Sequence, residues 1–313
     1  MLSRVSNSLY WMSRNIERAE NTARLISVRL IGSIEHEENH WDELISISGA
    51  NDVFEEHFER YDAHSVMDFM SFSTHNPNSI LNCIKLARED ARAIREIIPQ
   101  EFWEMINTFY WDVRQYKQEN WNVDTIDHFY QMIIRQSALF QGMVEATLSF
   151  DEAYLFIKMA KFIERSEKTA RILNIYYYRS EDPDHNDPSL YRHWYAVLQS
   201  VSGHEAFLKK HRPFINGERV IEFLLFDDAF PRSIQYCLDQ VYDVFQELEN
   251  GKIEHYSAEL NQLIAHMRNR FREITLVEVL TEDIHQFLQD FQQDCFKLGR
   301  LINKTYYLGE IKV

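Results

Sequence analysis

A charged helical stretch occurs twice in this chain, 147 residues apart. Residues 16–26 read IERAENTARLI and residues 163–173 read IERSEKTARIL, so seven of the eleven aligned positions are identical. Each copy lies in a longer segment without proline, whose apolar residues are spaced by three and four, the pattern of one buried helical face. In the first copy, this apolar seam consists of Val5, Leu9, Met12, Ile16, Ala19, Ala23, Ile26 and Leu30.

The opposite face of the first stretch is charged only in its middle. Tyr10 lies at one end, Leu25 and Val28 at the other, and Arg14 and Arg18 between them. We therefore predict two central helices that are covered on both sides and carry Arg and Glu into a mostly closed interior. Buried charge is costly unless it is paired, and Arg and Glu at helical spacing can supply the pairs. Two interpretations stay open: a structural salt-bridge network, or a ligand site built from the same residues.

Composition predicts an all-α fold with an extensive core. Apolar residues make up 45% of the 313 residues and aromatic residues 14%, whereas only 8 Gly and 6 Pro are present, too few for a turn-rich β fold. No stretch alternates like a strand followed by a hairpin turn. We expect a bundle of about ten or more helices, at 4–31, 41–47, 51–60, 65–71, 76–98, 100–118, 125–149, 151–179, 190–201, 203–210, 217–226, 231–251, 256–277 and 282–308.

Helix caps and a linker give the expected organisation. Asn76 and Asp124 are expected as N-caps, because their side chains can accept backbone N–H groups. The polar and acidic stretch 180–189 contains two prolines and reads as a linker. We expect a single domain over 1–313, with a possible division into 1–179 and 190–313.

Two further places concentrate charge. Arg88, Glu89 and Arg92 form a third Arg/acid cluster on the helix expected over 76–98. Arg232 follows Pro231 in the first turn of an expected helix, where the dipole disfavours a cation, so either a nearby Asp or an anionic ligand should offset it. The candidate ligand-binding residues are Arg14, Glu17, Arg18, Glu20, Asn21, Arg24, Arg88, Glu89, Arg92, Glu164, Arg165, Glu167, Arg171 and Arg232.

Several classes of function are disfavoured. The net charge of −16 makes nucleic acid and anionic membrane poor partners, and no apolar run has the roughly 18–20 residues of a spanning helix. The N-terminus does not resemble a signal peptide, and three distant cysteines (Cys83, Cys237 and Cys295) suggest buried thiols in a reduced cytoplasmic protein.

The sequence contains no glycine-rich phosphate loop, no G-x-S-x-G and no Cys-x-x-Cys motif, so these motifs assign no catalytic residues. Glu37 with His40, and Glu282 with His285, match the spacing used in di-iron helix bundles. Two such pairs are hardly above chance in a chain with 13 His, and the first pair falls in an expected loop. We therefore expect no metal and no cofactor.

Motifs along nearly the whole chain resemble the bacterial alpha-E family. They are LSR (2–4), LYWM (9–12), ERAENTAR (17–24), NPNSI (76–80), AREDAR (87–92), ER (164–165) and FPRS (230–233). The resemblance implies one all-helical domain, and a gene context shared with circularly permuted ATP-grasp peptide-ligase-like proteins and transglutaminase-like proteases. One departure is Asp90, where the family pattern more often has Asn; it adds a negative charge to the local network.

Two functions are expected from these observations. The first is an accessory or interaction protein of an ATP-grasp-type peptide-ligase or peptide-modification system, with that ligase or a transglutaminase-like protein as partner and a peptide or small anionic ligand bound at the Arg/Glu cluster. The second is a helical enzyme or ligand-binding protein that uses the buried cluster as its own site, Arg holding carboxylates or phosphates and a Glu acting as base. A di-metal carboxylate protein is a remote third alternative.

Overall fold

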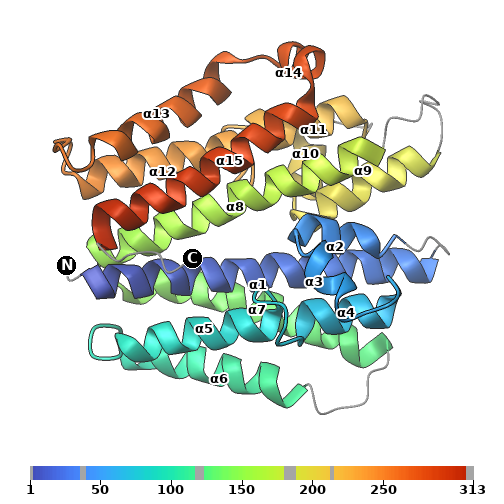
Figure 1. Ribbon diagram of the computed structural model, residues 1–313, viewed down its shortest axis with the longest axis horizontal. Coiled ribbons are helices and arrows are strands. Elements are labelled where there is room, and N and C mark those ends of the chain that lie inside the picture. The colour runs from blue at the N-terminus through green and yellow to red at the C-terminus, as the bar shows by residue number, and fades with distance from the viewer. Residues whose placement is uncertain (1–2, 36–39, 117–122, 180–187, 212–214, 308–313) are drawn as a thin grey trace. The chain divides into compact units, whose positions relative to one another are not determined.

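The computed structural model describes residues 3–35, 40–116, 123–179, 188–211 and 215–307. Within these ranges the chain forms fifteen α-helices and no strand (Figure 1). The predicted all-α fold with ten or more helices is therefore confirmed.

The chain divides into two compact units. The N-terminal unit comprises residues 8–157, and the C-terminal unit comprises residues 158–313 together with 1–7. The expected linker lies largely outside the described residues, at 180–187, and the expectation of a single domain stays a prediction.

The N-terminal unit contains the helices up to α7. Their bounds are α1 (Ser3–Glu35), α2 (Asp42–Ser48), α3 (Asn51–Glu55), α4 (Ala63–Ser71), α5 (Ile80–Ala93), α6 (Gln100–Tyr116) and α7 (Val123–Thr147). Every residue of the apolar seam predicted for α1, from Val5 to Leu30, is buried. Three and four residues separate neighbouring seam positions, so the seam stays on one side of the helix along its length.

The C-terminal unit contains most of α8 and the helices that follow. Their bounds are α8 (Glu152–Arg179), α9 (Pro188–Ser200), α10 (His204–Lys210), α11 (Gly217–Phe226), α12 (Ile234–Leu248), α13 (Ala258–Glu273), α14 (Leu276–Glu282) and α15 (Ile284–Ile302), followed by a π-helical turn (Asn303–Tyr307). Helix α13 packs against both α12 and α15, as α6 packs against both α5 and α7 in the other unit.

The two units repeat one arrangement. In each, a long charged helix is followed by short helices and then by a loop that reads Pro-x-Ser-Ile-x-x-Cys, at 77–83 and at 231–237. Ser79 and Ser233 are N-caps with nearly the same backbone angles (φ −61°, ψ 151° and φ −68°, ψ 151°), and each side chain accepts the backbone N–H three residues later. The sequence Ile-x-x-Phe-x-Gln also recurs, in α7 at 126–131 and in α15 at 284–289. The repeated charged helix is thus one part of a larger internal duplication.

Several expected helix boundaries were wrong, and three of them have a clear physical reason. Ser79, not Asn76, caps α5; the Asn76 side chain accepts the N–H of Asn78 at 2.9 Å and so shapes the loop before the helix. Helix α7 begins at Val123, one residue before the expected cap Asp124. The helix expected over 282–308 is interrupted at Asp283, whose φ of 103° ends α14 while its carboxylate caps α15.

Candidate functional site

The charged stretch of α1 is mostly buried. Arg14, Glu17, Glu20 and Asn21 expose between 2% and 6% of their surface. Arg24 pairs with Glu20 one turn earlier, and its Nε lies 2.9 Å from a Glu20 carboxylate oxygen. The inward placement of charge predicted for this helix is confirmed for these four side chains, and each of them has an interaction partner, as buried charge requires.

Arg18 connects α1 to the loop that precedes α5. Its side chain is half-buried, and its Nη1 donates a 2.8 Å hydrogen bond to Oδ1 of Asn78. Asn78 lies in the Pro-x-Ser turn, directly before the capping residue Ser79. The arginine of the first Glu-Arg pair thus binds the turn that starts the next long helix of its own unit.

Helix α8 carries the second copy in an equivalent arrangement. Glu164 is buried, Arg165 is half-buried, and Arg171 donates from Nε and Nη2 to Glu167 Oε1 at 3.3 and 3.2 Å. The Arg171–Glu167 pair corresponds to Arg24–Glu20 in α1. Thr169 lies on the same helix and donates from Oγ1 to the carbonyl oxygen of Arg232 at 2.8 Å, so this charged helix also holds its unit's Pro-x-Ser turn.

The third charged cluster lies at the surface between α5 and α6. Arg88 donates from Nε to Asn107 Oδ1 at 2.7 Å and from Nη1 to Glu89 at 2.9 Å. Glu89 also pairs with Arg92, whose side chain is 64% exposed. These three residues therefore belong to a surface network of the N-terminal unit, and we do not place them in the buried cluster of α1.

Aromatic rings surround the Arg88 guanidinium group. Its Cζ lies 5.8 Å from the ring centroid of Trp103, 4.9 Å from that of Tyr110 and 6.0 Å from that of Trp111. The rings attract the guanidinium group through cation–π contacts and so restrict its movement.

Asp90 is the one residue of the AREDAR motif with a strongly shifted pKa. Burial raises the pKa of its carboxyl group from 3.8 to about 7; a hydrogen bond from Ser8 opposes this rise and the neighbouring charge of Glu89 adds to it. This aspartate is therefore partly protonated near neutral pH, when it can donate a hydrogen bond as an asparagine amide does.

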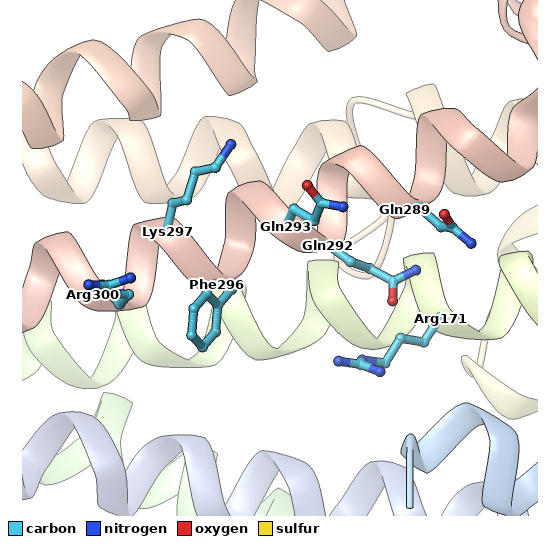
Figure 2. Close-up of a pocket in the computed structure, with 7 residues that line it drawn as sticks. All are labelled: Arg171, Gln289, Gln292, Gln293, Phe296, Lys297 and Arg300. Carbon is cyan, nitrogen blue, oxygen red and sulfur yellow. The ribbon is translucent and has the colours of Figure 1, made fainter. Parts of the chain in front are cut away.

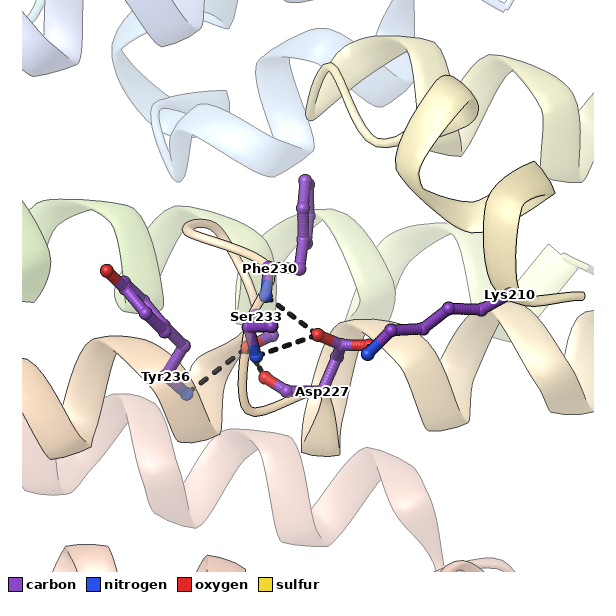
Figure 3. A network of polar contacts seen from close by, with 6 residues as sticks. Lys210, Asp227, Phe230, Ser233 and Tyr236 are labelled. Atoms are coloured by element: carbon purple, nitrogen blue, oxygen red, sulfur yellow. Dashed lines mark hydrogen bonds and ion pairs between the residues drawn. The ribbon is translucent and has the colours of Figure 1, made fainter.

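Arg232 lies in the loop before α12, and not in the first turn of that helix as expected. Helix α12 begins at Ile234, so Arg232 precedes the cap Ser233 and does not lie in the first turn. The expected conflict with the helix dipole was wrong for this reason. Asp227 does fold back into the loop, where it accepts the N–H groups of Ala229 and Phe230 at 2.9 and 2.7 Å (Figure 3).

Three further contacts hold this loop. Lys210 forms an ion pair with Asp227, and Ser233 donates to the carbonyl oxygen of Asp227 while its Oγ accepts the N–H of Tyr236 (Figure 3). Burial alone would raise the pKa of Asp227, but Lys210 and the two backbone N–H groups hold it below its usual value. The carboxylate of Asp227, itself a residue of this loop, therefore helps to fix the conformation of the loop.

A shallow groove of about 550 Å³ lies along α15 in the C-terminal unit (Figure 2). Arg171 of α8 also lines it and is the one candidate from the sequence that the groove contains. Sequence reasoning missed the remaining lining residues, because glutamines, a lysine and an arginine on a helix resemble an ordinary solvated face. These residues are Gln289, Gln292, Gln293, Phe296, Lys297 and Arg300.

The described residues contain no group of three or more His, Cys, Asp or Glu side chains placed to hold a metal ion. Glu282 ends α14 and His285 lies in α15, so the turn at Asp283 breaks the helical spacing expected for this pair. Glu37, the first member of the other expected pair with His40, lies outside the described residues, so that pair stays a prediction. All three cysteines are buried, as predicted, and none of them forms a disulfide in the described part of the chain. In the part of the chain that the structure describes, every helix is too short or too polar to cross a bilayer.

Comparisons with known proteins agree with the repeated Glu-Arg helices. No curated protein and no solved structure matches the chain. A family model does match, over residues 1–307, and it describes a predicted α-helical domain with a conserved ER motif. Since the match covers nearly all of the 313 residues, the chain is a member of the Alpha-E family.

Proposed function

We propose that this protein is an accessory subunit of a peptide-ligase or peptide-modification system, and that it docks on an ATP-grasp-type ligase or a transglutaminase-like protein. The resemblance to the alpha-E family suggests the context. The observation that carries the proposal is an aromatic–arginine face on α5, α6 and the turn between them, formed by Arg88, Arg95, Trp103, Tyr110, Trp111 and Arg114.

This face has the composition of a protein interface. Trp111 is 40% exposed, and the Arg114 guanidinium group lies 5.0 Å from its ring centroid. The Cζ atom of Arg95, in the turn between these helices, lies 5.6 Å from the ring centroid of Trp103. Trp, Tyr and Arg carry much of the binding energy at protein interfaces, because they bury large areas and lose little conformational freedom. The rings and guanidinium groups already hold one another in place, so docking would cost little further ordering.

Co-purification tests the proposal. The chain is expressed with an ATP-grasp-type ligase of the same genome, and association is measured at micromolar concentration. We expect a complex that the change of Trp111 and Arg114 to Ala weakens at least about tenfold, as for residues at the centre of an interface. The control is Phe150→Ala, which removes a more exposed aromatic ring (68%, against 40% for Trp111) from another part of the N-terminal unit. An unchanged complex in the double variant, or no complex with the unmodified chain, would refute the proposal.

The second candidate is a ligand-binding protein or enzyme that uses the buried charges of α1 and α8. Burial of Glu17 and Glu164, each followed by an arginine, favours it, since carboxylates beside guanidinium groups can bind anions or move protons. It predicts that Glu17→Gln abolishes ligand binding without weakening the complex with the ligase. Metal analysis of the purified protein checks the remaining di-metal alternative.

A further inference from the structure

The groove along α15 has the dimensions of an extended peptide. Its lining runs from Gln289 to Arg300, and eleven helical residues at 1.5 Å each span about 16 Å. An extended chain rises about 3.3 Å per residue, so about five residues fit along this length. The groove is open on one side; Phe296, Gln292 and Gln289 extend from α15 toward α8, where Arg171 lies (Figure 2).

The amide groups of the groove match a peptide backbone. Gln289, Gln292 and Gln293 each carry a carbonyl oxygen and an NH₂ group, so they can accept from peptide N–H groups and donate to peptide carbonyls. The NH₂ group of Gln289 already contacts Nε2 of His285 at 2.6 Å, which leaves its carbonyl oxygen and its second N–H for a peptide. The Nε2 atom of Gln292 is buried and has no hydrogen-bond partner among the described residues. A buried donor without an acceptor is unfavourable, and a peptide carbonyl in the groove would supply the acceptor.

The charge of the groove differs from that of the chain as a whole. The net charge of the protein is −16, yet the described residues that line the groove include three cations and no carboxylate. Arg171 is held by Glu167, and Lys297 pairs with Asp294 at 2.9 Å. Arg300 makes no ion pair with any described residue, so its positive charge is available to an incoming carboxylate.

An exposed aromatic ring lies between the amides and Arg300. Phe296 is 69% exposed, which places a large apolar surface in water unless a ligand covers it. A polyphosphate would use the cations but would leave the ring and the glutamine oxygens without contacts. A peptide would use all three kinds of group.

We propose that the groove between α8 and α15 binds an extended peptide segment of about five residues, with a carboxylate of the peptide at Arg300. This inference rests on the proposed function in a peptide-ligase system, and it assigns the peptide to the C-terminal unit, whereas the aromatic–arginine face belongs to the N-terminal unit. The groove would thus present a peptide while another surface of the protein binds the ligase.

Fluorescence anisotropy with the full-length chain tests the site. The probe is a pentapeptide of four alanines and a C-terminal glutamate with fluorescein at its N-terminus. Its matched control carries the same dye but ends in glutamine amide, so its peptide part has no carboxylate. We expect saturable binding of the first probe, weakened at least about tenfold by Arg300→Glu and by loss of the carboxylates. Phe296→Ala should weaken both probes. Lys252→Glu makes the same charge change at an exposed residue outside the groove and should bind like the unmodified chain.

Two outcomes would overturn the site. One is no saturable binding of the glutamate probe, or equal binding by Arg300→Glu with circular dichroism showing a folded protein. The other is displacement by inorganic triphosphate from the unmodified chain and from Phe296→Ala with equal potency, which would assign the groove to a polyanion. Ligase co-purification with Arg300→Glu separates the two proposals. If only the peptide site is wrong, the unmodified chain and Arg300→Glu both bind the ligase. If the accessory role is wrong, neither of them binds it.

Discussion

Replacing Asp90 with asparagine should stabilise the protein at alkaline pH. The carboxyl group has a pKa of about 7 in the folded protein and an ordinary value of 3.8. Each unit of difference corresponds to about 1.4 kcal/mol, so full ionisation at pH 8 costs the folded state about 4 kcal/mol before solvent screening. Asp90 keeps partial contact with solvent, and we therefore expect a penalty of about 2 to 4 kcal/mol at pH 8.

The sign of the effect follows from the raised pKa. Below about pH 4 the carboxyl group is protonated in both the folded and the unfolded chain, and it imposes no penalty. The penalty grows as the pH rises from 4 to 7 and is constant above that range. An asparagine amide keeps an oxygen that can accept from Ser8 and removes the repulsion by Glu89, so the variant carries no such pH-dependent cost.

Urea unfolding of both proteins between pH 5 and pH 8.5 measures the difference. The advantage of Asp90→Asn should be largest at pH 8 and should fall by roughly half or more at pH 5. Glu96→Gln serves as control, because it neutralises an exposed carboxylate close to the same helix and should shift the unfolding free energy by less than about 0.5 kcal/mol. A variant less stable than the unmodified chain at pH 8, or an advantage independent of pH, would show that Asp90 is ionised without penalty and would refute the reasoning.

Three further changes test the packing of the C-terminal unit by thermal or urea unfolding. Ser233→Ala removes the α12 cap and should cost about 1 to 2 kcal/mol; an unchanged urea midpoint would contradict the capping geometry. Gly217→Ala places a Cβ 2.8 Å from ring atoms of Trp194 and should cost about 1 to 3 kcal/mol, whereas a rise in melting temperature would mean that the ring moves aside freely. Tyr306→Phe removes the 2.7 Å hydrogen bond to the buried Glu249 and should cost about 1.5 to 3 kcal/mol, with a neutral result disproving the contact.

The sequence was sufficient to predict the fold class and the inward charge of α1. The three-and-four spacing from Val5 to Leu30 identifies a buried face, and every residue of that seam is buried. On the opposite face, apolar residues at both ends indicated that the charged middle, which includes Glu17, is covered, and Glu17 is buried. Such patterns depend only on the spacing of residues within one helix, so they predict its buried face whatever the helix packs against.

Other features depend on contacts that spacing does not reveal. Asn76 and Ser79 are both good N-caps, and the choice of Ser79 is made by the turn that Asn76 forms with Asn78. The break at Asp283 comes from a backbone with φ of 103°, which no residue pattern indicated. The groove depends on the placement of α15 beside Arg171, so its glutamines could not be distinguished from surface residues by sequence.

The duplication offers a physical reason for a site in one unit only. Gln131 and Gln289 occupy the same position of the repeated Ile-x-x-Phe-x-Gln sequence. Gln131 donates to Ser27 of α1 at 3.2 Å and so holds two helices of the N-terminal unit together, whereas Gln289 lines the groove. Each unit is stabilised by its own contacts, so a residue of one copy can change its contacts while the matching residue of the other copy keeps them. The architecture that both units share is then retained. A shared scaffold can therefore carry an aromatic–arginine face in one unit and a peptide-sized groove in the other, and the charged helices keep the same role in both: each holds the turn that begins the next long helix.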